Sequence, residues 1–453
     1  MDGQNSSDNA NLNFNTGMDR QPPMIDTSTT SDSHIVFDNS KERKSGKILT
    51  GTICGIIGIA LGAAGYFGVA QILNNQKTPE CECDCEEVAV DTSSDVDFDF
   101  LKMETAEQNL IYSPLSIKNG LSLLNAGAAG STKSQIENVL GNNELTKYNN
   151  IPDVLSLANS IFIRDTFKND VLGSYTDKVS QDYNAEINYD SFADGSVIDN
   201  WVNDKTFGLI NNLGLEPTKE TEMVLVNALA IQMDWKLKFD EAYPKNFYNV
   251  NNEEIFVDTL SEETSSDALA YYLDNDTTAL AMDLEPTSDN TELQFVAIMP
   301  NGNLADYIEN ADTNSVNRIV EQLKPASEPE YGIYAQIPKF KFDYELDFEN
   351  DLQSLGITNA FSDSADFSNM ATEPLKVDEA IHKTNIDFSE DGIKAAAVTA
   401  FGMKATAVLD GEVEEEPEPI KVIIDHPFLF VIRDKNTGEF WFVGTVYNPT
   451  QSQ

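Results

Sequence analysis

An unbroken run of 26 uncharged residues, residues 48–73, limits what this chain can fold into more than any other feature of its sequence. A helix of about 20 apolar residues is long enough to cross a lipid bilayer. A cleaved secretory signal has a shorter apolar stretch near the N-terminus, whereas this run begins only after residue 47. The sequence therefore predicts a single uncleaved transmembrane helix at residues 48–73.

Charge is distributed unevenly around this predicted anchor. Acidic residues follow it from Glu80 onward, and four basic residues precede it: Lys41, Arg43, Lys44 and Lys47. Because basic flanks stay on the cytoplasmic side, we expect the N-terminus in the cytoplasm and everything after the anchor outside the cell membrane. Residues 1–47 are rich in Asn, Ser, Thr and Asp without a sustained apolar period, which is typical of a disordered tail.

Three cysteines lie close together in the linker that follows, residues 74–95: Cys81, Cys83 and Cys85. A disulfide across one intervening residue is strained, so we favour disulfides between chains, and hence self-association. Metal binding is the weaker alternative, because three alternating thiols lack a fourth ligand for zinc. No cysteine occurs from Leu101 onward, so neither disulfides nor a zinc site stabilises the main body.

The net charge of −47 argues against nucleic acid as a partner, because phosphate would be repelled over much of the surface. The sequence also lacks a nucleophile elbow, an H-E-x-x-H motif and a P-loop. His34 lies in the predicted tail, and His382 and His426 lie in strand-like apolar segments, where a hydrogen-bonded core histidine is the commoner occupant. We therefore expect no enzyme activity, no cofactor and no metal.

Residues 96–453 show the patterns of one domain containing both helices and strands. Helical periodicity occurs at residues 117–130 and 197–214. Strand-like apolar runs occur at residues 155–165, 222–235, 293–300, 379–388, 420–434 and 439–448. This irregular mixture, without a repeated strand–helix–strand order, predicts the α+β class.

Several blocks of this region resemble one family. NLIYSPLSIKNGLSLLNAGAAGSTKSQIENVLG (residues 109–141) is similar to the first block of the serpins. Further blocks follow in that family's order: LANSIFIRD, DNWVNDKTFGLI, LVNALAIQMDWKLKF, IPKFKFDYE with LQSLGITNAFSDSADFS, VDEAIHKTNIDFSEDGIKAAAVTA and DHPFLFVIRDKNTGEFWFVGTVYNP. The resemblance runs from about residue 96 to residue 449, and on it the chain is identified as a membrane-anchored prokaryotic serpin.

This resemblance implies an α+β domain of three β-sheets and about nine helices with an exposed reactive-centre loop. Serpins mostly inhibit serine proteases as suicide substrates. The loop is cleaved, the protease stays linked to it as an acyl-enzyme, and the hinge side of the loop inserts into the central sheet as a new strand. We therefore expect an extracytoplasmic serine endopeptidase inhibitor with a metastable fold.

Residues 390–400 resemble the hinge of that loop. A segment that slides between two strands should carry small side chains, little charge and no proline. Side chains alternate between faces, so the odd-numbered positions from Ile393 to Thr399 share one face, which we expect to be buried. Ile393 departs from the Thr or Ser usual in inhibitory members, and its bulk could slow insertion. The hinge residues are Glu390, Gly392, Ile393, Ala395, Ala396, Ala397 and Thr399.

The family's usual spacing from the hinge glycine places the scissile bond between Thr406 and Ala407. Small residues there suit elastase- or subtilisin-like proteases with shallow pockets. The bond between Lys404 and Ala405 is the alternative, and it would suit a trypsin-like protease. The target protease therefore stays open among these three classes.

Six other positions match residues that control opening of the central sheet in serpins. Because buried polar groups need partners, breaking such a network should loosen the sheet. Four form the polar cluster under the sheet, one marks the point where the loop enters, and one pairs with Glu390; they are Ser113, Ser116, Asn227 and His382, then Trp235, then Lys339.

Two other functions stay open. A non-inhibitory surface binding protein or chaperone would keep the fold without the trap, although the hinge lacks the charged and proline residues expected in such relatives. An adhesion or scaffold protein would instead use the cysteine cluster and the glycine-rich anchor.

Overall fold

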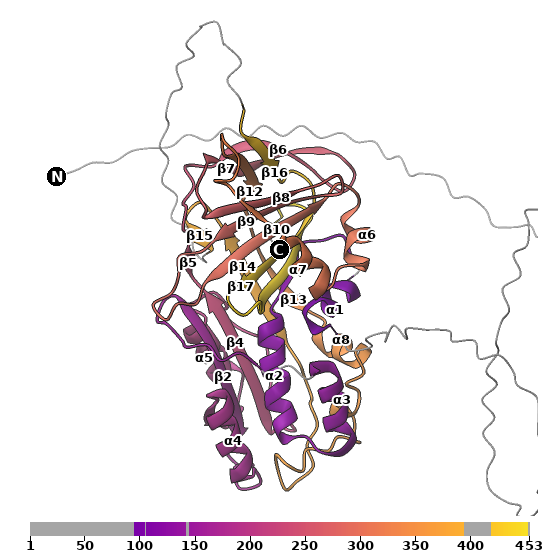
Figure 1. Cartoon of the computed structure of the whole chain (residues 1–453). Coiled ribbons are helices and arrows are strands. Elements are labelled where there is room, and N and C mark those ends of the chain that lie inside the picture. Colours follow the sequence, from indigo (N-terminus) through magenta and orange to yellow (C-terminus); the bar gives the residue numbers. More distant parts are fainter. Residues whose placement is uncertain (1–94, 105, 142–144, 394–417, 452–453) are drawn as a thin grey trace, which may run out of the picture. The chain divides into compact units, whose positions relative to one another are not determined.

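The computed structural model describes residues 95–104, 106–141, 145–393 and 418–451 (Figure 1). The predicted tail and anchor, and the linker up to residue 94, lie outside these ranges. Among the described residues, no helix is both long and apolar enough to cross a membrane. The anchor, the topology and the cysteine cluster therefore stay predictions.

Eight α-helices and one 3-10 helix lie in the described ranges, in keeping with the expectation of about nine helices. The longest begins where Ser113 accepts a hydrogen bond from the backbone N–H of Ser116 and Pro114 takes the first helical position, both favourable at a helix start. The helices are α1 (Val96–Met103), α2 (Pro114–Gly127), α3 (Gly130–Leu140), α4 (Gly173–Tyr183), α5 (Ser196–Lys205), α6 (Leu304–Glu309), α7 (Thr313–Glu321), α8 (Phe348–Ser354) and η1 (Asn359–Phe361).

One expected helix is shorter than its sequence pattern. The periodicity over residues 197–214 predicts a single helix, but α5 ends at Lys205. Phe207 and Gly208 follow with φ angles of +56° and +79°. An α-helix cannot continue through left-handed residues, so the chain leaves the helix there.

The largest sheet has seven strands and forms much of the apolar core. Every residue of β10, β17 and β18 is buried, in keeping with their mostly apolar sequences. In order across the sheet the strands are β1 (Leu110–Tyr112), β18 (Phe440–Val446), β17 (Phe428–Asp434), β10 (Leu293–Pro300), β9 (Thr277–Asp283), β8 (Leu269–Leu273) and β11 (Lys324–Pro325).

A four-stranded sheet contains the segment that follows the predicted loop. Its strand β16 starts at Ile420 and pairs with β12 in parallel. In order the strands are β16 (Ile420–Ile423), β12 (Ile333–Pro338), β7 (Glu254–Thr264) and β6 (Tyr243–Tyr248).

The remaining strands form two groups that belong to one parted sheet. Only Gln232 separates β4 from β5, so the chain runs directly from one group into the other. Among the described strands, β4 and β14 do not pair with each other. The resemblance implies three sheets, whereas the described strands form four hydrogen-bonded groups, because β4 and β14 do not pair. The groups are β13 (Phe340–Leu346), β14 (His382–Phe388), β15 (Gly392–Ile393) and β5 (Met233–Asp234), and β3 (Glu186–Asp190), β2 (Leu155–Arg164) and β4 (Met223–Ile231).

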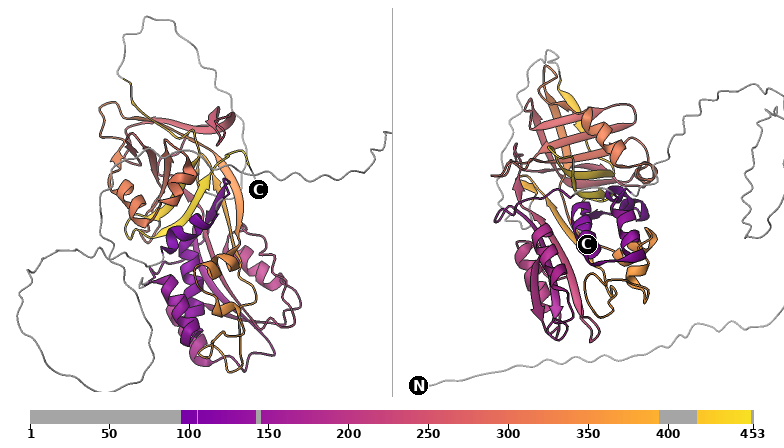
Figure 2. Two further views of the ribbon diagram at one scale, coloured as in Figure 1. Left: turned by 90° about the vertical axis from the view of Figure 1, so that its right-hand side faces the viewer. Right: turned by 60° about the horizontal axis from the view of Figure 1, so that its bottom comes forward.

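Helix α2 packs against both β4 and β18. Figure 2 shows the indigo N-terminal helices beside the strands of the parted sheet. Because α2 starts at the residues Ser113 and Pro114, this packing brings the predicted polar residues of the helix to the opening in the sheet.

Candidate functional site

Two of the predicted hinge residues, Gly392 and Ile393, form the short strand β15 inside the parted sheet. Gly392 pairs with Asp234, and Ile393 pairs with Met233 on one side and with Phe388 on the other, all antiparallel. The side chain of Ile393 is buried, with only 4% of the residue exposed. The segment Gly392–Ile393, predicted to start the hinge, thus lies between β14 and β5.

Gly392 occupies a position that only glycine can take without strain. Its φ is +155°, and a Cβ atom there would lie 2.1 Å from the carbonyl oxygen of Met233 and 2.7 Å from Cα of Asp234. Both contacts are with backbone, which cannot move aside as a side chain can. The glycine therefore lets the hinge pass close to β5.

Trp235 closes the turn that leads into the hinge. Its indole Nε1 donates to the carbonyl oxygen of Ser389 at 2.8 Å, and its backbone N–H donates to the carbonyl oxygen of Asp391 at 2.8 Å. The ring is 1% exposed and packs edge-on against Phe388, with centroids 5.2 Å apart. This tryptophan thereby connects β5 to the end of β14.

Lys339 and Glu390 form an ion pair beside the same turn, with Nζ and Oε1 2.8 Å apart. Both side chains are partly exposed. Desolvation opposes ionisation of Glu390, but the hydrogen bond and charge of Lys339 outweigh it and lower the pKa of the carboxyl. The backbone carbonyl of Glu390 also accepts from the N–H of Phe239 at 3.1 Å.

The four predicted polar residues lie together between α2, β4 and β14, and we call them the shutter cluster: Ser113, Ser116, Asn227 and His382. The backbone N–H of Ser113 donates to Nε2 of His382 at 3.0 Å, and its hydroxyl donates to the carbonyl oxygen of Trp441 at 2.6 Å. The hydroxyl of Ser116 donates to Oδ1 of Asn227. The cluster therefore connects the two strands that border the opening through the start of α2.

His382 is held in its neutral form. Burial lowers its pKa to about 3. Nε2 accepts a hydrogen bond, so in the neutral ring the proton sits on Nδ1. A neutral, buried histidine is suited to positioning and not to proton transfer near neutral pH.

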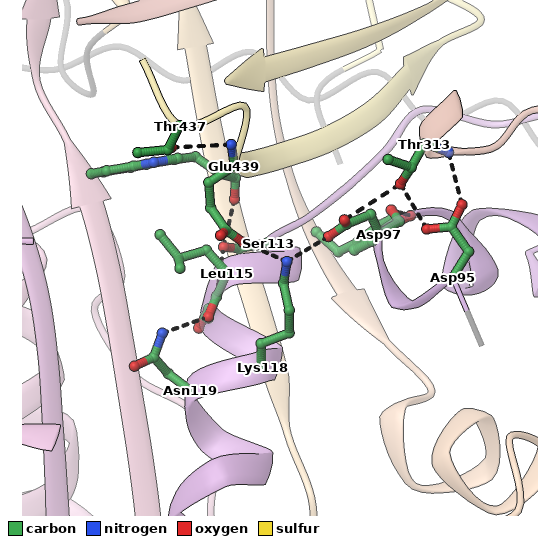
Figure 3. A network of polar contacts seen from close by, with 12 residues as sticks. Asp95, Asp97, Ser113, Leu115, Lys118, Asn119, Thr313, Thr437 and Glu439 are labelled. Atoms are coloured by element: carbon green, nitrogen blue, oxygen red, sulfur yellow. Dashed lines mark hydrogen bonds and ion pairs between the residues drawn. The ribbon is translucent and has the colours of Figure 1, made fainter. Parts of the chain in front are cut away.

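A buried ion network holds the start of α2 in place (Figure 3). Nζ of Lys118 lies 2.8 Å from Oδ1 of Asp97 and also contacts Glu439. Thr313 donates from its backbone N–H to Asp95 at 2.7 Å. Burial raises the pKa of Asp97, although Lys118 opposes that shift. The network joins α1, α2, α7 and the start of β18 next to the shutter cluster.

The opening between β4 and β14 holds a cavity of about 680 Å³. It is lined by residues 223–229 of β4 and by residues 374–384, which lead into β14. The shutter cluster borders it from the side of α2. A continuation of β15 beyond Ile393, between β14 and β4, would therefore run into this cavity.

Sequence reasoning did not single out Asn159. Its Nδ2 donates to the carbonyl oxygen of Tyr183 at 2.9 Å, and its Oδ1 accepts from Nδ2 of Asn227 at 2.8 Å. Asn159 is directly opposite Asn227 in the pairing of β2 with β4. A polar residue in each of two apolar strands indicates that the two could form a buried hydrogen bond. Their pairing, however, depends on a strand register that the sequence alone leaves open. The Lys118 network was missed for the same reason, because its members come from distant segments.

A family model described as "Serpin (serine protease inhibitor)" matches residues 94–449. The chain belongs to the serpin family. An uncharacterized serpin-like protein of Methanosarcina mazei is 28% identical to this chain, and the alignment covers 76% of this chain and 82% of that protein. Serine protease inhibitor 42Dd of Drosophila melanogaster is 27% identical, and the alignment covers 80% of this chain and 97% of that protein. The crystal structure of tengpin, a thermophilic serpin in the native state, is 27% identical, covers 79% and 93%, and has a TM-score of 0.63.

The expected serpin fold of mixed helices and sheets is thus confirmed. Serpins are in general protease inhibitors and not enzymes. Among the described residues of this serpin, no group of three or more His, Cys, Asp or Glu side chains is placed to hold a metal ion. His426 lies at the surface, where its ring stacks on Tyr248 with centroids 5.0 Å apart.

Part of the predicted loop falls outside the described residues of this serpin, which stop at Ile393 and resume at residue 418. The roles assigned to these positions stay predictions: Ala395, Ala396, Ala397, Thr399, Lys404, Ala405, Thr406 and Ala407.

Proposed function

We propose that this serpin inhibits serine proteases as a suicide substrate outside the cell membrane. The observation that carries the proposal is the position of Gly392 and Ile393, which lie as a strand between β14 and β5 at one end of the open sheet. A segment that enters the sheet from this end continues a strand that already exists.

The open sheet supplies a reason for further insertion. The facing edges of β4 and β14, nine and seven residues long, are not paired with each other. A strand placed between them would offer hydrogen-bond partners to both edges, each bond contributing about 0.5–1.5 kcal/mol net. The gain accumulates along the strand, which favours the inserted state.

The register of β15 supports the predicted buried face. Continuing both pairings one residue at a time would place Ala395 opposite Ile386 and Ile231, which are 2% and 5% exposed. The same count brings Thr399 opposite His382 and Asn227. A threonine hydroxyl would then meet the shutter cluster, the polar part of an otherwise apolar row.

The covalent step would occur in the loop. The serine hydroxyl oxygen of the protease attacks the carbonyl carbon of Thr406, the peptide bond to Ala407 breaks, and the new amine takes a proton. The ester that remains links the protease to the hinge side of the loop. Elastase- and subtilisin-like proteases suit this bond, and a trypsin-like protease would suit the alternative bond between Lys404 and Ala405.

The location of the protein rests on its sequence. The uncharged length of residues 48–73 and the basic residues before them support a single-pass helix with the N-terminus in the cytoplasm. Disulfides between chains through Cys81, Cys83 and Cys85 would add self-association at the outer surface.

The second candidate is a non-inhibitory binding protein or chaperone, and the bulk of Ile393 favours it. Ile393 nevertheless fits between Met233 and Phe388 with 4% exposure, so its apolar side chain is accommodated in the sheet. This fit supports the inhibitor over the binding protein.

The test uses the full chain in detergent with subtilisin-, elastase- and trypsin-like proteases. We expect a complex that survives denaturing gels, and a released C-terminal peptide whose first residue identifies the bond. Clean cleavage without a complex, together with an unchanged melting temperature, would show that the chain does not trap proteases. Gels with and without reductant test the disulfides in the same samples.

A further inference from the structure

The sequence contains two Asn-x-Ser/Thr motifs in which the middle residue is not proline. One begins at Asn5, in the predicted cytoplasmic tail, and the other consists of Asn275, Asp276 and Thr277, in the domain predicted to lie outside the cell. At Asn448 a proline occupies the middle position, which excludes that site. The motif is the acceptor for N-linked glycans, which occur on surface loops of proteins that leave the cytoplasm.

The motif at Asn275 lies at the tip of a hairpin. Strand β8 ends at Leu273 and β9 begins at Thr277, so Asn275 and Asp276 lie in the turn between the two strands. Asn275 and Asp276 are exposed, whereas Thr277 is buried. A glycan on the side chain of Asn275 would therefore extend into solvent without displacing packed side chains.

The shape of this turn does not depend on the side chain of Asn275. A carboxylate oxygen of Asp274 accepts from the backbone N–H groups of Asp276 at 2.8 Å and Thr277 at 2.7 Å, as in an Asx turn. Asn301 donates from Nδ2 to the carbonyl oxygen of Asn275 at 2.8 Å. Within the described ranges, the side-chain amide of Asn275 has no hydrogen-bond partner, so its nitrogen is available for modification.

We propose that Asn275 carries an N-linked glycan on the outer side of the membrane. The donor is an oligosaccharide linked through phosphate to a membrane lipid. Nδ2 of Asn275 forms a bond to the anomeric carbon of the first sugar, the bond from that carbon to the phosphate oxygen breaks, and Nδ2 gives up one proton. The lipid phosphate leaves with the electron pair. Because Thr277 is buried in the folded hairpin, the transfer precedes closure of the hairpin.

The inference rests on the proposed location of the domain and not on protease trapping. Residues 273–277 are all described, and none of them lines the cavity between β4 and β14. A glycan on Asn275 thus starts outside the opening and is compatible with the proposed inhibition.

The test uses the full chain, produced in cells that transfer N-linked oligosaccharides to exported proteins. Mass spectrometry of its peptides follows treatment with a peptide N-glycosidase, which converts a glycosylated asparagine to aspartate. We expect this conversion at Asn275 and not at Asn5, and none without the glycosidase. Asn275→Gln should remove the glycan completely. Thr277→Val keeps the shape of the buried side chain but lacks the hydroxyl and should also abolish the glycan, whereas Thr277→Ser should retain it.

A membrane-impermeant amine reagent applied to intact cells reports the location independently, through exposed lysines such as Lys324 and Lys421. If these lysines are labelled and Asn275 is unmodified, the glycan is wrongly inferred and the location stands. If they are not labelled, the proposed location is refuted and the glycan inference with it. A glycan that persists in Thr277→Val would also overturn the inference, because the motif would then not direct the transfer.

Discussion

The indole Nε1 of Trp235 donates a hydrogen bond to the carbonyl oxygen of Ser389 at 2.8 Å, across 154 residues of sequence. This bond joins the end of β5 to the turn from which the hinge starts. The bond is partly buried: Trp235 is only 1% exposed, and Ser389 is partly exposed. The hydrogen bond therefore connects the residue that follows β5 to the residue that follows β14, next to Gly392 and Ile393.

Trp235→Phe should lower the free energy of unfolding by about 1–2 kcal/mol, because the partly buried carbonyl of Ser389 loses its donor. Urea unfolding followed by circular dichroism measures the change. Trp201→Phe is the control: it removes an indole hydrogen bond to Glu186 at the surface, and its effect should be smaller. Equal losses from the two variants would contradict a special contribution of the Trp235 bond.

Gly392→Ala should expel the hinge from the sheet, because the new Cβ would lie 2.1 Å from the carbonyl oxygen of Met233. Hydrogen exchange in the peptide that contains Ile393 should become faster, and cleavage of the loop by proteases should accelerate. Gly120→Ala in α2 is the matched control, because a Cβ there meets nothing within 4 Å. Unchanged exchange in the Gly392 variant would mean that the hinge adopts another path.

His382 should make the fold less stable in acid. Burial lowers its folded pKa to about 3, whereas the unfolded pKa is near 6.5. Below pH 6.5 the unfolded chain binds a proton that the folded chain does not, so stability falls by up to about 1.4 kcal/mol per pH unit until the folded pKa is reached.

Urea unfolding of the full chain between pH 7 and pH 5 measures this slope, a range chosen because most carboxyl groups titrate lower. His382→Gln retains an acceptor for the N–H of Ser113 but cannot be protonated, so its slope should be flatter. A variant with the same slope as the unsubstituted protein would show that His382 does not titrate as described.

Lys118→Met should be strongly destabilising, by about 3–5 kcal/mol, because it leaves Asp97 and Glu439 without their cation in a buried setting. Thermal unfolding checks the change. Lys178→Met removes a lysine from an exposed pair with Asp182 and should have no measurable effect. A mild effect of Lys118→Met would mean that water or a shifted side chain replaces the lysine.

The residues of the shutter cluster could be named from the sequence because they lie in ordered blocks with recognisable residues, whereas the hinge role of residues 390–400 stays a prediction. Ser113 and His382 are 269 positions apart, yet the structure places them in hydrogen-bond contact. The contribution of the buried Lys118 could not be predicted. A lysine inside an amphipathic helix is ordinarily exposed, and only the approach of α1 and β18 provides carboxylates for it.

The sequence by itself determined the family of this protein, because the order of its sequence blocks is a property of the chain alone. It also determined which side chains of the predicted hinge would share a face of a strand, because side chains alternate along a strand. The tertiary structure alone decided that the central sheet is open and that Ile393 is already inside it. Strand pairing joins residues far apart in sequence, so which edges meet and which stay apart depends on how the whole domain packs.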